Sequence, residues 1–255
     1  MPFFDGYVKF YSTSMTSASP DRLNARYEAI IESNRDLFCG KRILDIASHD
    51  GRWSFTAIQA GASQVIGIEA RSELVENENH NFEHYEVDKS RYKFIQGDVF
   101  EVLSSGGFQV DVVLCLGYMY HTIRHAELID LIDRCGASHI ILDTEIVQQD
   151  GVNDFQGEMR EEGARKIWKE PVMVQMIQEP VEHESMAYQD SMTRSGFALV
   201  ARPSEGAIEI LLDHFGYSVQ RVDWASLLFG RGDPGQLKDY ADGWRGTFVC
   251  SKRHR

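Results

Sequence analysis

Three acidic side chains, Asp45, Glu69 and Asp98, stand at the ends of short apolar runs in this sequence. Each run has the length of a strand. An acid directly after a strand can accept hydrogen bonds from the hydroxyl groups of a ribose. A fourth apolar run ends at Gly117 and leads to His121, whose imidazole can take up a proton near neutral pH. The residue types therefore predict a nucleoside-binding site with a candidate base close to it.

The elements that would position these side chains alternate between apolar strands and amphipathic helices. The pattern predicts strands over residues 42–47, 63–69, 92–96, 110–116 and 139–145, helices over 52–60, 72–87 and 126–135, and a closing strand pair at 217–222 and 246–251. Strands that alternate with helices form a parallel sheet with right-handed crossovers. We therefore expect an α/β fold with a doubly wound, mostly parallel, seven-stranded Rossmann-like sheet.

A single domain is expected for a chain of 255 residues. It divides into an N-terminal lid and helix at 1–40, a cofactor-binding core at 41–145, an insertion at 146–202 for substrate binding or dimerisation, and the C-terminal part of the sheet at 203–255. Ser19 caps a helix whose apolar spacing continues to Phe38. Within the insertion, the pattern predicts a helix over 158–169 and strands over 172–178 and 197–201.

The formal net charge is −13, from 26 basic and 39 acidic side chains. This charge repels polyphosphate at long range and disfavours a nucleic-acid substrate. A small polar molecule is the expected partner, together with a homodimer contact. The sequence has neither a membrane-spanning apolar run nor the pattern of a signal peptide, so no membrane partner is expected. The four cysteines are scattered, as is typical of reduced thiols in a cytoplasmic protein.

The four strand ends, in this order and spacing, resemble the class I S-adenosylmethionine-dependent methyltransferases over roughly residues 41–145, with a weaker similarity at 203–222. Glu69 matches the acid that ends the second strand in that family, and Asp98 matches the acid beside the adenine. The fourth motif of the family matches Asp111–His121. A nicotinamide dehydrogenase would need the pattern G-x-G-x-x-G after the first strand, and the sequence ASHDGR lacks it.

The first motif departs from the glycine-rich loop of the family. Asp45 and Gly51 are retained, but Ala47 and His49 stand where glycines are usual. Bulkier residues limit the approach of a backbone to its ligand, so weaker cofactor binding and a non-catalytic nucleoside-binding protein both stay open. The resemblance implies S-adenosyl-L-methionine as the cofactor and places it against these residues: Asp45, Ala47, Ser48, Gly51, Trp53, Glu69, Ala70, Asp98, Val99, Leu116, Gly117 and Tyr118.

His121 is the candidate general base, because a histidine at this place is common in methyltransferases whose fourth motif reads like YMYH. Asp143 and Glu145 are two residues apart on one predicted strand, so both side chains point to the same face, near His121. Three interpretations of the two acids stay open. They orient the histidine, they bind Mg²⁺ as in the sugar O-methyltransferases that this arrangement resembles, or they are ordinary acids satisfied by backbone and solvent.

The expected reaction is transfer of a methyl group to a hydroxyl of a small polar metabolite, with a sugar favoured. The YMYH turn also resembles enzymes that modify the wobble base of transfer RNA, so an N- or tRNA-directed methyltransferase is the alternative. Aromatic residues near the N-terminus have two interpretations. They fold over the cofactor, with Tyr7 or Tyr11 against the sulfonium, or they dock on the sheet as part of the core.

Overall fold

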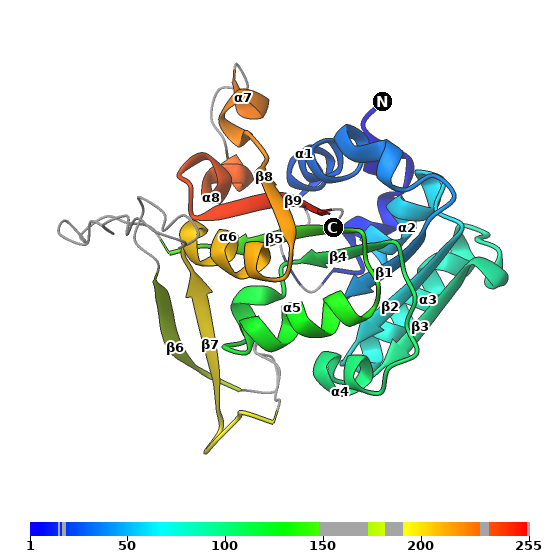
Figure 1. The fold of residues 1–255 in the computed structure, drawn as a ribbon. Coiled ribbons are helices and arrows are strands. Elements are labelled where there is room, and N and C mark those ends of the chain that lie inside the picture. Colours follow the sequence, from blue (N-terminus) through cyan, green and yellow to red (C-terminus); the bar gives the residue numbers. More distant parts are fainter. Residues whose placement is uncertain (15, 17–18, 148–172, 182–190, 230–234, 254–255) are drawn as a thin grey trace.

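A seven-stranded sheet lies at the centre of the structure, a computed structural model that describes residues 1–14, 16, 19–147, 173–181, 191–229 and 235–253 (Figure 1). The strand order is β3-β2-β1-β4-β5-β9-β8. Strands β1 to β5 pair in parallel, and β9 runs antiparallel to both of its neighbours. The strands are β1 (Arg42–Ile46), β2 (Gln64–Glu69), β3 (Tyr92–Gln96), β4 (Val112–Leu116), β5 (His139–Glu145), β8 (Tyr217–Arg221) and β9 (Arg245–Lys252). The predicted mostly parallel, seven-stranded Rossmann-like sheet is confirmed.

Helices cover both faces of this sheet (Figure 1). One face carries α1 (Pro20–Ile30), α2 (Arg52–Gln59) and α3 (Ser72–His84), and the other carries α4 (Val99–Ser104), α5 (His125–Arg134) and α6 (Glu205–His214). Two short helices, α7 (Trp224–Leu228) and α8 (Lys238–Ala241), lie against α1 through a small apolar cluster. Among the described helices, none has both the length and the apolar character that crossing a bilayer requires.

The central strand β1 shows why the sheet is covered on both sides. Successive side chains of a strand point to opposite faces. Ile43 joins the core under α1, α2 and α3, whereas Leu44 and Ile46 join the core under α4, α5 and α6. The carboxyl end of β1 therefore emerges between two packed layers, where the strand order reverses between β1 and β4. Ligands of doubly wound sheets bind at such a reversal.

Helix α1 begins as predicted but ends earlier. The hydroxyl of Ser19 accepts a hydrogen bond from the backbone of the first turn, at 3.4 Å, as a capping residue should. The helix ends at Ile30 rather than Phe38, and a 3₁₀ segment follows. The side chain of Asn34 donates to the last carbonyls of the helix, at 3.0 and 3.2 Å. This side chain satisfies carbonyls that a continued helix would have used, so it stops the helix.

The aromatic residues at the N-terminus dock as core. Phe4 and Phe10 are fully buried, and Tyr7 packs edge-on against Phe55 of α2 with ring centroids 4.7 Å apart. Tyr11 donates a hydrogen bond to Asp5 at 2.9 Å. This part of the chain therefore stabilises the face of the sheet that carries α2 and α3.

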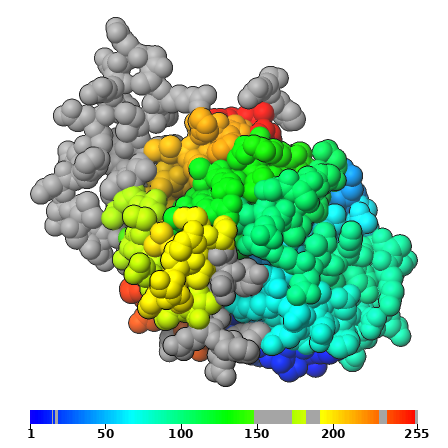
Figure 2. All heavy atoms as spheres, turned by 90° about the horizontal axis from the view of Figure 1, so that it is seen from below, coloured from blue at the N-terminus to red at the C-terminus, as the bar shows by residue number. Residues whose placement is uncertain are grey.

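The insertion contains a two-stranded antiparallel sheet of its own, β6 (Val174–Pro180) with β7 (Phe197–Pro203). Both strands were predicted here, whereas the helix predicted over 158–169 lies outside the described residues. Figure 2 shows the hairpin, in yellow-green and yellow, beside the green part of the chain that contains α5. Val174, Met176 and Phe197 are exposed on it. A role of this insertion in substrate binding or dimerisation stays a prediction.

Candidate functional site

A cavity of about 520 Å³ opens where the carboxyl ends of β1, β2 and β4 meet. Most of the residues that were predicted to hold a cofactor line it, and the candidate base His121 and the acid Glu145 line it too. The lining residues that the sequence predicted for the cofactor are Ala47, Trp53, Glu69, Ala70, Asp98, Val99, Leu116, Gly117 and Tyr118. Residues from five separate strand ends and loops therefore converge on one space.

Three predicted cofactor residues, Asp45, Ser48 and Gly51, do not line this cavity. Asp45 is 1% exposed and accepts a hydrogen bond from Ser54 of α2 at 2.8 Å. Burial raises the pKa of this carboxyl to about 7. Gly51 precedes α2 with a φ of 77°, and a Cβ there would lie 3.1 Å from the ring of Phe82. These residues shape the loop and join it to α2, so their positions do not support direct contact with the cofactor.

The loop after β1 keeps left-handed backbone conformations although it lacks glycines. The φ angles are 53° at Ala47 and 61° at His49. Such a conformation costs an L-residue roughly 1–2 kcal/mol, and glycine adopts it without that cost. The sequence therefore departs from the family in its side chains, while the backbone follows the course that glycines would allow.

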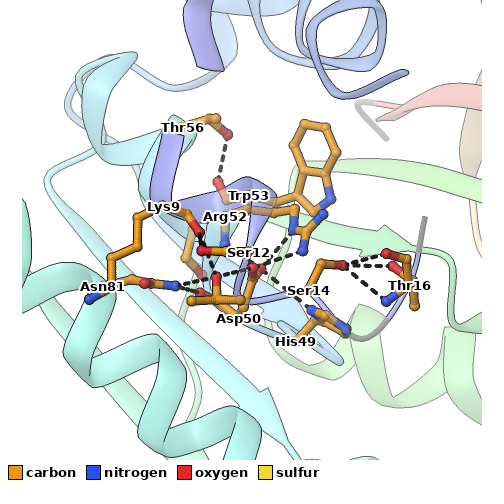
Figure 3. Close-up of polar contacts among 12 residues, drawn as sticks. Lys9, Ser12, Ser14, Thr16, His49, Asp50, Arg52, Trp53, Thr56 and Asn81 are labelled. Carbon is orange, nitrogen blue, oxygen red and sulfur yellow. Dashed lines mark hydrogen bonds and ion pairs between the residues drawn. The ribbon is translucent and has the colours of Figure 1, made fainter. Parts of the chain in front are cut away.

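A buried carboxylate holds this loop in place. Asp50 is fully buried and accepts two hydrogen bonds from the guanidinium of Arg52, at 2.6 and 2.7 Å. Thr13 donates to the same carboxylate at 2.8 Å, and Asn81 of α3 donates to its backbone carbonyl at 2.9 Å. Figure 3 shows Arg52, Asn81 and His49 converging on Asp50. Burial alone would raise the pKa of Asp50, but the charge and hydrogen bonds of Arg52, together with the contact from His49, outweigh burial and lower it.

Glu69, at the end of β2, connects two loops of the cavity. Its carboxylate accepts hydrogen bonds from the backbone amides of His49, at 3.1 Å, and Arg71, at 3.0 Å. The side chain is 6% exposed and lines the cavity. Each carboxylate oxygen has two lone pairs, so Glu69 can also accept hydrogen bonds from the two hydroxyls of a ribose.

Replacement of Glu69 by alanine is expected to weaken binding of S-adenosylhomocysteine by about 10- to 100-fold, since hydrogen bonds to a charged group contribute about 1.5–3 kcal/mol. Isothermal titration calorimetry measures this affinity. Glu73→Ala is the matched control, because Glu73 is an exposed acid in the first turn of α3 and does not line the cavity. Equal affinities for the two variants would show that Glu69 does not bind the ribose.

Asp98 lies after β3, where it caps a helix and also lines the cavity. Its Oδ1 accepts hydrogen bonds from the amides of Phe100 and Glu101, at 2.9 and 3.1 Å, and so caps α4. Within the described residues, Oδ2 has no hydrogen-bond partner, and the residue lines the cavity. The free oxygen is available to a polar group of a bound nucleoside.

His121 follows β4 in a short 3₁₀ turn and lines the same cavity as Glu69. Its Nδ1 is buried and has no hydrogen-bond partner among the described residues. Burial, together with the nearby charges of Arg245, Arg71 and Arg202, lowers the pKa of the imidazole to about 4. His121 is therefore neutral at physiological pH and able to accept a proton.

Asp143 has partners other than those predicted. It is fully buried and does not line the cavity. Its oxygens accept four hydrogen bonds of 2.6–3.1 Å, from Arg26, Tyr240, Arg245 and Thr247. Burial favours the protonated acid, but the charges of Arg245 and Arg26 and the hydrogen bonds from Thr247 and Arg245 together outweigh burial and lower the pKa of Asp143. Asp143 therefore stabilises two arginines rather than hydrogen-bonding to His121.

Glu145 lies at the cavity and is paired with arginines. Its Oε2 is 2.6 Å from the Nε of Arg202, and its Oε1 is 3.8 Å from the Nη1 of Arg245. Among the described residues, no group of three or more histidine, cysteine, aspartate or glutamate side chains could hold a metal ion. The oxygens of Asp143 and Glu145 face cations already, so the two acids do not fit the predicted Mg²⁺ site.

The sequence did not predict that two buried arginines line the cavity. Arg26 and Arg245 both line the cavity and are 9% and 7% exposed. Arg26 lies three residues after Leu23 and four before Ile30, within the buried stripe of α1. A charged residue inside an apolar stripe was the available signal for Arg26. No pattern marks Arg245, which stands at the first position of β9.

The strand order, with β9 reversed beside β5, and the cavity at the β1–β4 switch point define the class I methyltransferase fold. Residues 43–138 match a sequence family described as a methyltransferase domain. This stretch runs from β1 to the loop before β5 and carries Glu69, Asp98 and His121. Over residues 43–138 the chain is therefore similar to a methyltransferase domain, and its sheet has the class I fold.

Solved structures resemble the chain over nearly its whole length. The N-terminal domain of EvdMO1, crystallised in the presence of SAH and D-fucose, is 16% identical with a TM-score of 0.58, over 94% of this chain and 85% of that one. A putative S-adenosylmethionine-dependent methyltransferase from Listeria monocytogenes is 14% identical with a TM-score of 0.58, over 91% of this chain and 100% of that one. At these identities the likeness shows the fold.

A curated relative covers only part of the chain. Ribosomal RNA large subunit methyltransferase I from Escherichia coli O139:H28 is 30% identical over 77 residues, which is 29% of this chain and 19% of the relative. The aligned part is thus about a fifth of the length of the curated relatives that match. The similarity concerns the shared domain.

Proposed function

We propose that this protein transfers a methyl group from S-adenosyl-L-methionine to a hydroxyl group of a small polar metabolite. The observation that carries the proposal is the presence of Glu69 and a neutral His121 in one cavity. Such a reaction needs two groups from the protein. One is a hydrogen-bond acceptor for the ribose of the cofactor, here at the end of β2, and the other is a base, here after β4.

The residues present fit the cofactor. Glu69 and Asp98 offer carboxylate oxygens to a nucleoside, and Gly117, which has no side chain, lines the cavity beside them. The bound cofactor supplies an electrophilic methyl group. Methyl transfer is an in-line displacement, so the protein contributes by orienting the acceptor and excluding water.

His121 would remove the proton of the acceptor hydroxyl as the new oxygen–methyl bond forms. The neutral imidazole needs no prior deprotonation at physiological pH, because its pKa is about 4. The same low pKa disfavours a fully formed imidazolium, so proton removal and methyl transfer would be concerted. Among polar hydroxyl acceptors we favour a sugar, since the EvdMO1 domain of the same fold was crystallised with D-fucose.

Methyl transfer is expected to survive exhaustive treatment with EDTA, because both acids of the predicted Mg²⁺ site are paired with arginines. The assay compares initial rates before treatment, after treatment, and after re-addition of MgCl₂. Loss of activity that MgCl₂ restores would reinstate a metal in the reaction.

The proposal is tested by transfer of a radiolabelled methyl group to a panel of sugars, hydroxy acids, amines and transfer RNA. Methylation of a small hydroxyl compound is the expected result. Methylation of RNA alone would favour the alternative function, which the partial likeness to a ribosomal RNA methyltransferase supports and the net charge of −13 opposes. Tight binding of S-adenosylhomocysteine without turnover of any acceptor would indicate a nucleoside-binding protein.

A further inference from the structure

Two buried guanidinium groups meet at one carboxylate oxygen beside the cavity. The Nε of Arg245 lies 2.7 Å and the Nη2 of Arg26 lies 3.1 Å from Oδ1 of Asp143. Arg26 also stacks over the ring of Trp53, with its Cζ 4.8 Å from the ring centroid. The two arginines come from α1 and β9, which are far apart in the sequence, and both side chains line the cavity.

Arg26 has donor capacity that the protein does not use. Its Nε is buried without a hydrogen-bond partner among the described residues, and the residue as a whole is 9% exposed. A buried N–H group without an acceptor destabilises the folded protein, and does so more strongly when the group is charged. The guanidinium fork matches the two oxygens of a carboxylate or phosphate. An oxyanion in the cavity would bind the part of this guanidinium that lines the cavity and would balance its charge.

Among the described residues, the charges at this point do not balance. Arg26, Arg245 and Arg202 contact the carboxylates of Asp143 and Glu145, so three positive charges face two negative ones. This local excess is positive in a chain whose formal net charge is −13. A buried charge requires a partner, so a single negative charge on the ligand would complete the group.

The position of the two arginines favours the acceptor over the cofactor as the source of that charge. Glu69 lies on β2, and β9 is four strand positions away in the sheet, about 19 Å at the usual strand spacing. His121 follows β4, between them. The Nη2 of Arg245 approaches the end of β4 so closely that a Cβ at Gly117 would lie 3.1 Å from it. The arginines thus lie beyond the reaction centre when seen from the ribose site.

We propose that the acceptor carries a carboxylate or phosphate group in addition to its hydroxyl, and that Arg26 and Arg245 bind this group. The inference rests on the proposed function, because it concerns the acceptor of that reaction. The acid group anchors the acceptor on the side of β5 and β9, and the hydroxyl then faces His121. Sugar acids, sugar phosphates and hydroxy acids have this combination of groups.

The wild-type protein tests the inference with matched acceptor pairs. Each pair consists of an acid and its neutral counterpart: a sugar acid with its amide, and a sugar phosphate with the free sugar. The acid member is expected to have a kcat/KM at least on the order of 10- to 100-fold higher, as for a charge-assisted bidentate contact. The two pairs separate a carboxylate from a phosphate. Equal rates within both pairs would overturn the inference and leave the methyl-transfer function standing.

Substitution of Arg26 gives a second, independent readout. Asp143 keeps Tyr240, Arg245 and Thr247 as donors when Arg26 is replaced, so Arg26→Gln is expected to fold. It should raise the KM of the acidic acceptor by about 10- to 100-fold, and the Kd of S-adenosylhomocysteine should stay within about twofold. Arg26→Lys keeps the charge without the fork and should restore only part of the loss.

Arg42→Gln is the matched control, since it removes one positive charge from a half-exposed arginine at the start of β1 that does not line the cavity. A KM shift of the same size in this control would reduce the effect to general electrostatics and overturn the inference. A weaker Kd for S-adenosylhomocysteine in Arg26→Gln with an unchanged acceptor KM would also overturn it, because the arginine would then bind the cofactor.

Discussion

Replacement of Asp143 by asparagine is expected to lower the free energy of unfolding by about 3–5 kcal/mol, the usual effect of breaking a buried ion pair by removing one partner. The change leaves the guanidinium groups of Arg26 and Arg245 buried without their carboxylate. It also replaces a carboxylate that accepts four hydrogen bonds by an amide, whose nitrogen can only donate. Chemical denaturation followed by circular dichroism measures the loss.

The pH dependence of stability gives the same experiment a second readout. The pKa of Asp143 is lowered in the folded state, so its contribution is complete above the unfolded value of about 3.9 and is lost as the pH falls below it. Part of the acid-induced loss of stability should therefore be absent from the variant. Asp130→Asn is the control, because Asp130 pairs with Arg134 on the exposed side of α5. Such a pair contributes at most about 1 kcal/mol. A similar loss in both variants would contradict the buried role of Asp143.

Replacement of His121 by alanine is expected to lower kcat by about 10²- to 10⁴-fold, the usual contribution of a positioned general base. The affinity for S-adenosylhomocysteine should change little, because the residue proposed to bind the ribose, Glu69, lies on another strand. His139→Ala is the control, since His139 begins β5, at the end of the strand away from Glu145, and does not line the cavity. A nearly normal kcat in His121→Ala would remove the residue as the base.

The pH–rate profile of the wild-type protein tests the environment of His121. Only the neutral imidazole can accept the proton, so kcat/KM should rise with pH through the pKa of about 4 and then stay level through neutrality. An ordinary histidine would place this limb near pH 6.5. A rise of kcat/KM near pH 6.5 that is absent from the alanine variant would show that His121 is the base. It would also show that the imidazole is less desolvated than in the structure.

The sheet was predictable because its signals are local. The bounds of β3 and β5 agree with the apolar runs that predicted them, and the acids Glu69 and Asp98 stand at the strand ends as expected. Short stretches of sequence are enough to predict the alternation of strands and helices, and the parallel arrangement of the strands follows from that alternation. Helix bounds were less predictable: a side chain outside α1, that of Asn34, decides where the helix ends.

The site was predictable only in part, because several of its contacts join distant segments. The alternation along β5 correctly put Asp143 and Glu145 on one face, since both approach Arg245. It could not indicate that Asp143 would be enclosed by partners from α1 and β9, about a hundred residues away in either direction. Similarly, Ala47 is not a residue type that predicts a left-handed backbone. The buried Asp50 network, which long-range contacts complete, accounts for that conformation.

The enclosure of Asp143 also has a consequence for the order in which the protein can assemble. One partner, Arg26, precedes it in the sequence, but Tyr240, Arg245 and Thr247 follow it by 97 to 104 residues. During synthesis β5 is complete long before those three residues leave the ribosome. Until then a charged carboxylate at this position must stay hydrated, because burial with one partner is unfavourable. The strands from β1 to β5 can therefore pair early, whereas the acceptor side of the cavity forms only when β9 docks.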